Sequence, residues 1–129
     1  MAKERSPRPT DAELSILRVL WQNGPSTVRE VRDVLNARKK TGYTTVLKFM
    51  QIMLEKRLVE RDESRRTHVY RPRIPAEKTQ RQLVGDLMER AFAGSAQKLI
   101  MQALSSKKVS ADELQQIRDL LDDLERKTS

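Results

Sequence analysis

Residues 41–73 read "TGYTTVLKFMQIMLEKRLVERDESRRTHVYRPR" and join a crowded apolar segment to a short basic one. Residues 42–56 have apolar side chains at helical spacing, which predicts a helix with one face in a core. That face consists of Val46, Phe49, Met50 and Met53. Residues 58–62 and 67–72 are two β-type runs joined by the polar residues 63–66, which together predict a hairpin.

Two shorter helices are expected upstream. Thr10 and Thr27 each stand three residues before a glutamate, which is the pattern of a capping box at a helix N-terminus. Apolar periodicity extends these helices over about residues 11–22 and 28–37. Their apolar stripes are expected to consist of Leu14, Leu17, Leu20 and Trp21, and of Val28, Val31 and Leu35. Three helices and a hairpin are typical of a winged helix-turn-helix, in which the third helix enters the major groove of DNA.

The chain changes character after residue 75. Helical patterns cover about residues 76–93, 96–104 and 111–126, and "SADE" at Ser110 offers a third capping box. We therefore expect a mainly α protein with a small β-hairpin wing, in two domains, 1–75 and 76–129. The last three helices are too short to close a core alone, so we expect a homodimer. The residues expected at its interface are Leu83, Leu87, Phe92, Leu99, Ile100, Leu104, Leu114, Ile117, Leu121 and Leu124.

The positive charge is confined to the first half of the chain. The 129 residues include 26 lysines and arginines and 18 acidic residues. Residues 1–75 hold 17 of the basic and 9 of the acidic residues, and residues 76–129 hold 9 of each. The whole excess of eight charges therefore accompanies the winged-helix pattern, which favours contact with a polyanion. A basic balance that only aids solubility is the alternative.

The residue types present give poor support to catalysis or metal binding. His68 is the single histidine and there is no cysteine, so one chain cannot form a His-based dyad or a thiolate metal site. Met50 and Met53 lie at helical spacing, which favours core packing over a soft-metal site. Trp21 lies on an apolar stripe, which favours core packing over stacking on a base. We expect no enzymatic activity, no cofactor and no metal.

No segment predicts membrane insertion. The chain has no apolar run that could span a bilayer and no signal-peptide pattern after its basic start. The absence of cysteine fits a reducing compartment. We expect a cytoplasmic protein.

The helix over residues 42–56 has a second face that is polar and free of acids until Glu55. Thr44, Lys48 and Gln51 fall on this face at i, i+4 and i+7, and Thr45 stands beside them. A face that only meets solvent rarely lacks acids in this way, so we expect this face to contact DNA.

Each residue type there suits a contact with a duplex. The hydroxyl of Thr44 or Tyr43, together with helix N-terminal amides, can hold phosphate oxygens. The Thr45 methyl can contact a thymine methyl, and Lys48 can reach guanine acceptors or a phosphate. The alternative role for Tyr43 is a hydrophobic contact with the first helical turn.

Basic residues flank the helix on both sides. Arg65 and Arg66 at the tip of the hairpin can reach the DNA backbone or the minor groove, or can form a solvated turn. His68 is either structural or faces a phosphate, and Tyr70, on the same face of its strand, can cover the core. Further candidates for phosphate contact are Arg38, Lys39 and Lys40.

With these residues established, the sequence resembles the BlaI/MecI family of penicillinase repressors, which includes CopY-type copper regulators. "TDAELSILRVLW" (residues 10–21) is similar to the first helix of that family and "TVREV" (27–31) to the second. "GYTTVLKFMQIMLEKRLVERDESRRTHVYRP" (42–72) is similar to its recognition helix and wing. The resemblance covers about residues 10–124. It implies a homodimeric winged-helix repressor of an inverted-repeat operator with TACA/TGTA-type half-sites.

The resemblance further implies control of a β-lactamase or related antibiotic-resistance operon. It implies release by proteolysis, triggered by a membrane sensor with a metalloprotease domain. Two features depart from the family pattern. The C-terminal cysteines of CopY-type members are absent, so copper-thiolate sensing is not expected. Gln102-Ala103 stands where penicillin-responsive members have an Asn-Phe bond, so cleavage at that bond is not expected and the inducing signal stays open.

Two other functions fit part of the sequence. A non-specific architectural DNA-binding protein would share the charge pattern but would have no preferred inverted repeat. A protein-interaction adaptor could use a winged helix to bind another protein, although the charge asymmetry argues against it.

Overall fold

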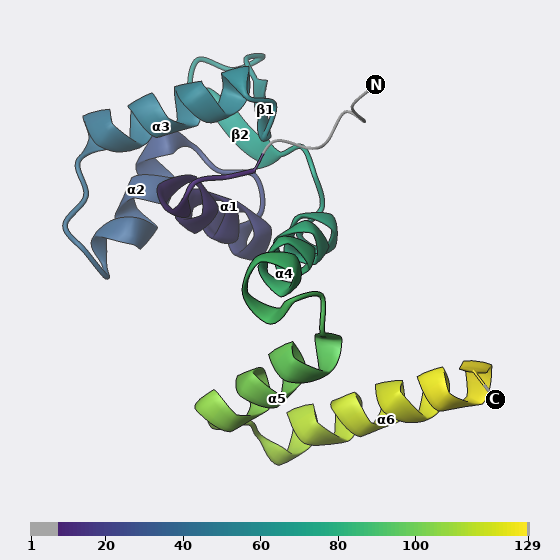
Figure 1. The fold of residues 1–129 in the computed structure, drawn as a ribbon. Coiled ribbons are helices and arrows are strands. Elements are labelled where there is room, and N and C mark those ends of the chain that lie inside the picture. The colour runs from purple at the N-terminus through teal and green to yellow at the C-terminus, as the bar shows by residue number, and fades with distance from the viewer. Residues whose placement is uncertain (1–7, 129) are drawn as a thin grey trace, which may run out of the picture. The chain divides into compact units, whose positions relative to one another are not determined.

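The computed structural model describes residues 8–128 and divides into two compact units. The winged-helix unit ends at Val84 and the helical unit begins at Gly85. The division therefore falls inside helix α4, downstream of residue 75, where the change in sequence character begins. Figure 1 labels the helices and strands along the chain. The first unit contains α1 (Asp11–Asn23), α2 (Val28–Asn36), α3 (Tyr43–Glu55), β1 (Val59–Asp62) and β2 (Val69–Pro72). The remaining elements are α4 (Ala76–Phe92), which crosses the division, α5 (Ala96–Ser106) and α6 (Ala111–Thr128).

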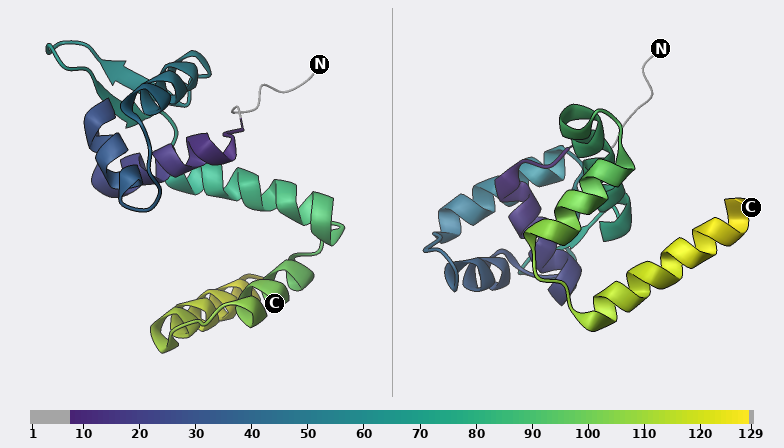
Figure 2. Two further views of the ribbon diagram at one scale, coloured as in Figure 1. Left: turned by 90° about the vertical axis from the view of Figure 1, so that its left-hand side faces the viewer. Right: turned by 60° about the horizontal axis from the view of Figure 1, so that its bottom comes forward.

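This order of elements confirms the predicted fold class, mainly α with a small hairpin wing. Strand β1 pairs antiparallel with β2, with Val59 opposite Pro72 and Asp62 opposite Val69. In Figure 2 the hairpin projects away from the helices of its unit. Strand β2 begins two residues later than predicted, at Val69. The connection between the strands is longer because a turn stabilised by a side-chain hydrogen bond starts at the last residue of β1. The Asp62 carboxylate accepts a hydrogen bond of 2.9 Å from the Ser64 amide.

Both capping boxes predicted in this unit are present. The Thr10 hydroxyl accepts from the Glu13 amide at 3.2 Å, and the Glu13 carboxylate accepts from the Thr10 amide at 2.8 Å. Thr27 and Glu30 repeat the arrangement at 3.2 and 2.9 Å. Each box satisfies two amides that a helix start would otherwise leave without partners, so the starts of α1 and α2 are fixed locally.

The winged-helix unit closes around one hydrophobic core. Its members are Ile16, Leu17, Val19, Leu20, Val28, Val31, Val46, Met50, Met53, Leu58, Val59 and Tyr70. The predicted stripe of α1 was wrong in omitting Ile16 and Val19, because α1 packs against α2, α3 and β2 and is covered over a wider arc than one stripe. Leu14 and Trp21 are half-buried instead, and Trp21 packs against the core from outside.

Strand β2 is anchored to the helices through the loop between α1 and α2. Ser26 and Tyr70 exchange two backbone hydrogen bonds, Ser26 N to Tyr70 O at 2.9 Å and Tyr70 N to Ser26 O at 2.8 Å. The Tyr70 side chain is fully buried, which confirms its core role. The wing is thus part of the folded unit rather than a free arm.

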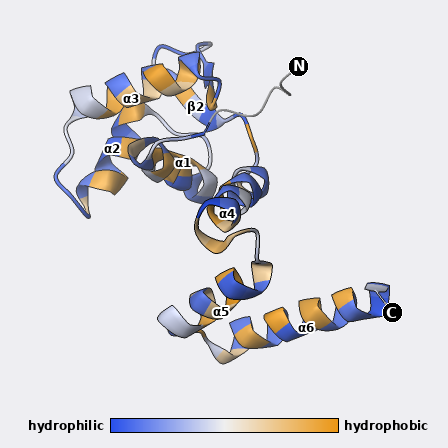
Figure 3. Cartoon of the chain, in the orientation of Figure 1, coloured by the Kyte–Doolittle hydropathy of each residue, from blue (hydrophilic) through white to orange (hydrophobic). Residues whose placement is uncertain are grey.

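The helical unit has a different character. Neither α5 nor α6 contains a buried residue. Figure 3 shows hydrophobic residues recurring along α6 between hydrophilic ones. The capping box predicted at Ser110 is only half formed: its hydroxyl accepts from the Glu113 amide at 3.1 Å, but the Glu113 carboxylate accepts from that hydroxyl instead of the Ser110 amide. The exposed large apolar residues of α4–α6 are Val84, Leu87, Ile100, Met101, Leu120, Leu121 and Leu124.

Across residues 8–128, no helix has the length and apolar character that crossing a bilayer requires. The same residues contain no cluster of three side chains suited to holding a metal ion.

Candidate nucleic-acid interface

Helix α3 begins without the caps that close α1 and α2. Its N-cap is Gly42, which makes no side-chain hydrogen bond, and its first turn contains no acidic residue. Amides at such a helix start have no intrahelical acceptor, and the helix dipole adds a partial positive charge there. The start of α3 is therefore open to an anion such as a phosphate oxygen.

Helix α3 separates a core face from a polar face. Val46, Met50 and Met53 are fully buried, and Phe49 is half-buried beside them. The residues predicted to read DNA all lie on the exposed side. They are Tyr43, which is 48% exposed, Thr44, Thr45 and Lys48, and Gln51 lies exposed on the same face. No core contact competes for these side chains, so they are available to a ligand.

The hairpin presents two kinds of arginine. Arg61 pairs with Glu63, and Arg71 pairs with Glu60 at 2.9 Å, so strand arginines are neutralised within the wing. Arg65 and Arg66 lie in the exposed turn between the strands, and neither forms an ion pair at contact distance within residues 8–128. Hydrogen bonds from Ser64 lower the pKa of the Asp62 carboxyl, and Arg65 is still close enough to Asp62 for its charge to contribute. The wing tip thus presents two arginines to solvent, of which Arg65 is partly compensated by Asp62. His68 is half-buried at the base of the turn, just before β2.

The loop between α2 and α3 carries three further cations. Arg38, Lys39 and Lys40 are all exposed. The loop is held by the Asn36 side chain, which accepts from the Thr41 amide at 2.9 Å, and by the Thr41 hydroxyl, which donates to the Lys39 carbonyl at 2.7 Å. Its positive charges are therefore kept next to the uncapped start of α3.

A buried ion pair, absent from the sequence predictions, ties the end of α3 to the start of α1. Lys56 Nζ lies 2.7 Å from Glu13 Oε1, and the Glu13 side chain is only 3% exposed whereas that of Lys56 is 32% exposed. Burial disfavours the charged carboxylate, but hydrogen bonds from Lys56 and from the Thr10 amide outweigh it and lower the pKa of Glu13. The partners are far apart in sequence, so no local pattern could have indicated the pair.

The family model for penicillinase repressors matches residues 9–123. The chain belongs to the penicillinase repressor family. Among curated proteins it is similar to the transcriptional regulator BlaI of two Mycobacterium tuberculosis strains, CDC 1551 / Oshkosh and H37Rv. In each case 34% of 121 residues are identical, and the match covers 89% of this chain and 83% of the relative. The BlaI/MecI resemblance inferred from the sequence is thereby confirmed.

Solved structures of this penicillinase repressor family have the same fold. The chain is similar in structure to the DNA-binding domain of the repressor BlaI and to the monomeric form of Bacillus licheniformis BlaI in complex with the blaP half-operator. Each match has a TM-score of 0.51 and 22% identity and covers 59% of this chain and 93% of the other. As a member of the family, the protein is a BlaI-like transcriptional repressor with a DNA-binding domain. The family is one of transcriptional regulators, which are not a class of enzyme.

Proposed function

We propose that the protein binds an inverted-repeat operator as a homodimer and represses transcription by covering a promoter. The observation that carries this proposal is the polar side of α3. Its side chains are exposed and it has no acidic residue until Glu55, while the opposite face of α3 is buried in the hydrophobic core. A rigid helix with a solvent-facing polar side is the form in which a winged helix enters a major groove.

The individual contacts follow from this placement. The uncapped α3 amides and the Tyr43 and Thr44 hydroxyls hold phosphate oxygens, which fixes the position of the helix. Thr45 contacts a thymine methyl, and Lys48 donates to guanine or to phosphate. Arg65 and Arg66 reach the DNA backbone or the minor groove flanking the site.

In this proposal the helical unit joins two copies of the chain into the homodimer. No residue of α5 or α6 is fully buried within one chain, although Leu114 and Ile117 are half-buried. Leu114, Ile117, Leu121 and Leu124 recur at spacings of three and four, as in a coiled-coil seam. Pairing of these seams between two chains removes their apolar area from water. Two recognition helices then reach successive major grooves, about 10 bp apart or a multiple of it.

The family resemblance supports half-sites of TACA/TGTA type, a resistance operon as the target and release through a membrane-sensor metalloprotease pathway. Gln102 and Ala103 are both exposed on α5 within one chain. Their side chains differ from the Asn-Phe pair, so any proteolytic release uses another bond. A repressor acting on genomic DNA in this way works in the cytoplasm.

Selection of bound duplexes from a random pool by the full-length protein tests the proposal. We expect enrichment of one inverted repeat, bound about 10³–10⁷ times more tightly than its scrambled version at physiological salt. Equal affinity for both duplexes would favour the architectural function. No binding to any duplex would favour the adaptor function.

A further inference from the structure

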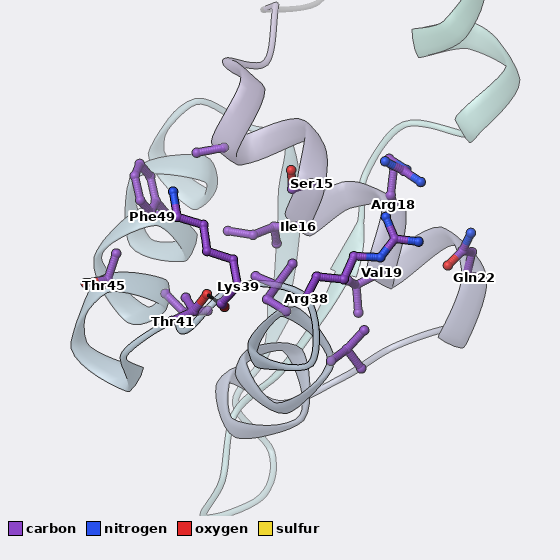
Figure 4. Close-up of a pocket in the computed structure, with 14 residues that line it drawn as sticks. Ser15, Ile16, Arg18, Val19, Gln22, Arg38, Lys39, Thr41, Thr45 and Phe49 are labelled. Carbon is purple, nitrogen blue, oxygen red and sulfur yellow. Dashed lines mark hydrogen bonds between the residues drawn. The ribbon is translucent and has the colours of Figure 1, made fainter.

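A pocket of about 370 Å³ opens between α1, the end of α2 and the start of α3 (Figure 4). Its volume falls in the range of about 300–1,000 Å³ that is typical of small-molecule sites. Ile16, Val19 and Val46 form its buried floor, and Val34 is an apolar wall residue that is 42% exposed. Leu35 and Phe49 complete the apolar lining. A hydrophobic body of ligand size would bury this lining.

The charged groups of the pocket are all cationic, and its other polar residues are neutral. Arg18, Arg38 and Lys39 line it, and no acidic residue does. None of the three makes an ion pair or side-chain hydrogen bond to another residue in the described range 8–128. In Figure 4 the Arg38 side chain points toward Arg18, and that of Lys39 runs toward Phe49. Arg18 and Arg38 carry like charges that repel each other, and a bound anion relieves this repulsion.

We propose that this pocket binds a small amphiphilic anion, an aliphatic or aromatic body with one carboxylate, and that its occupation weakens DNA binding. The apolar body fills the space above Ile16 and Val19, and the carboxylate accepts from Arg18 and Arg38. The pocket is distinct from the exposed face of α3, since only Thr45 belongs to both.

The effect on DNA follows from the shared residues and rests on the proposed function. Arg38 and Lys39 belong to the loop that presents positive charge beside the start of α3, and a bound carboxylate neutralises part of that charge. Thr41 and Thr45 also line the pocket, so a ligand contacts the first turn of α3 directly. By linkage, DNA must weaken ligand binding by the same factor as ligand weakens DNA binding.

Binding is measured first without DNA, by calorimetry and by the methyl NMR shifts of Val34 and Leu35 in the full-length protein. The probes are decanoate, acetate and 1-decanol. We expect decanoate to bind once per chain, and acetate and decanol to bind at least about tenfold more weakly, because each lacks one half of the recognition. Equal binding of decanol, or decanoate shifts confined to α5 and α6, would overturn the site.

Two variants locate the site, each with a matched control. Ser15→Trp fills the pocket from α1, and Ser105→Trp places the same side chain on α5, where the serine is also exposed and also donates to the carbonyl four residues before it. Ser15→Trp should abolish decanoate binding and its control should not. Arg18→Gln should weaken binding about three- to fivefold and Arg81→Gln, outside the pocket, should not. Unchanged binding by both pocket variants would overturn the proposal, and circular dichroism checks that each is folded.

The coupling is tested by titrating the selected duplex with and without saturating decanoate. Wild type should lose DNA affinity and Ser15→Trp should not. Equal affinity with and without decanoate would overturn the coupling. Failure of the protein to bind any duplex would overturn the proposed function. The measurement of decanoate binding would still be valid, because it is made without DNA.

Discussion

The winged-helix unit and the helical unit are built from similar apolar fractions but use them in opposite ways. In the first, residues from three helices and both strands converge on one core, and several side chains are completely buried. In the second, α5 and α6 keep Ile100, Met101, Leu120, Leu121 and Leu124 exposed. The first unit therefore carries its own stability, whereas the second has apolar surface that one chain leaves in water.

The difference follows from helix geometry. Three helices that cross, closed by a hairpin, can bury apolar faces in every direction. Helices α5 and α6 are amphipathic, and a pair of short helices can cover only a narrow strip of each other's surface. A DNA-reading face needs a rigid support, which the closed unit gives, and a dimer needs an unfilled apolar face, which the open unit gives.

The largest expected effect is on operator affinity and comes from placing charges on the apolar face of the helical unit. Glutamate at Leu99, Leu114 and Leu121 together should give a monomer, with operator affinity lowered about 10²–10⁴-fold, because linked half-sites supply effective concentration. Sedimentation velocity and fluorescence anisotropy measure the two results. Glutamate at Gln97, Gln102 and Gln116, exposed on the same helices, is the control for charge. A triple leucine variant that still sediments as a dimer would show that the interface lies elsewhere.

The next effect concerns the closed core. Met50→Ala removes a fully buried side chain and should lower the free energy of unfolding of the winged-helix unit by about 2–5 kcal/mol. Leu120→Ala, made in the monomeric triple variant, should change stability by less than about 0.5 kcal/mol, because that side chain is exposed. Urea denaturation measures both. Equal costs at the two positions would remove the contrast between the units.

The buried pair of Glu13 and Lys56 should make the closed unit sensitive to acid. Glu13→Gln should cost about 1–3 kcal/mol at neutral pH, since it weakens a buried hydrogen-bonded contact. The folded pKa of Glu13 lies below its ordinary 4.5, so its stabilisation is present above that value and is lost as pH falls from 4.5 through the folded pKa.

The difference in unfolding free energy between wild type and Glu13→Gln should therefore shrink as pH falls below about 4.5. Glu30→Gln is the matched control, because Glu30 closes the same kind of capping box but is exposed and has no lysine partner among residues 8–128. A pH-independent difference for Glu13→Gln would show that the ion pair contributes nothing to stability.

At the candidate DNA interface the expected effects act on binding rather than on stability. Lys48→Ala should weaken operator binding by about 1–3 kcal/mol and, if Lys48 reads a base, should relax specificity at that position. Lys98→Ala, exposed on α5, is the control. Anisotropy with the selected duplex and its single-base variants measures both affinity and specificity. Unchanged affinity would remove Lys48 from the interface.

The smallest change is in salt dependence. Replacing Arg65 and Arg66 by glutamine should reduce affinity for all sequences and flatten the plot of log affinity against log salt by about one unit per lost phosphate contact. Arg71 is already paired with Glu60, so Arg71→Gln should leave the slope nearly unchanged. An unaltered slope in the double variant would mean that the wing tip is only a solvated turn.

Much of the fold could be predicted because its signals are local. The capping boxes at Thr10 and Thr27 and the alternation in the hairpin act within a few residues of sequence. The errors arose where distant elements decide. Ile16, Val19 and Leu20 stand at helical spacing, but α1 is apolar over so wide an arc that spacing alone does not separate them from Leu14 and Trp21. The packing of α2, α3 and β2 around α1 decides which of these side chains are buried.

The candidate interface shows the same division. The polar side of α3 was predictable from spacing alone, since helix geometry fixes which side chains share a face. The Glu13–Lys56 pair and the cationic pocket were not predictable. Each joins residues from separate helices, and only packing brings them within reach of each other.

By itself, the sequence determined the order of helices and hairpin, the confinement of positive charge to one half and the acid-free face of α3. These properties depend on residue types and short-range spacing. The tertiary structure decided which apolar residues close a core and which stay exposed, which lysine pairs with the buried glutamate, and that three cations from separate elements line one apolar cavity. Such arrangements depend on contacts between segments far apart in the chain, which chain folding alone creates.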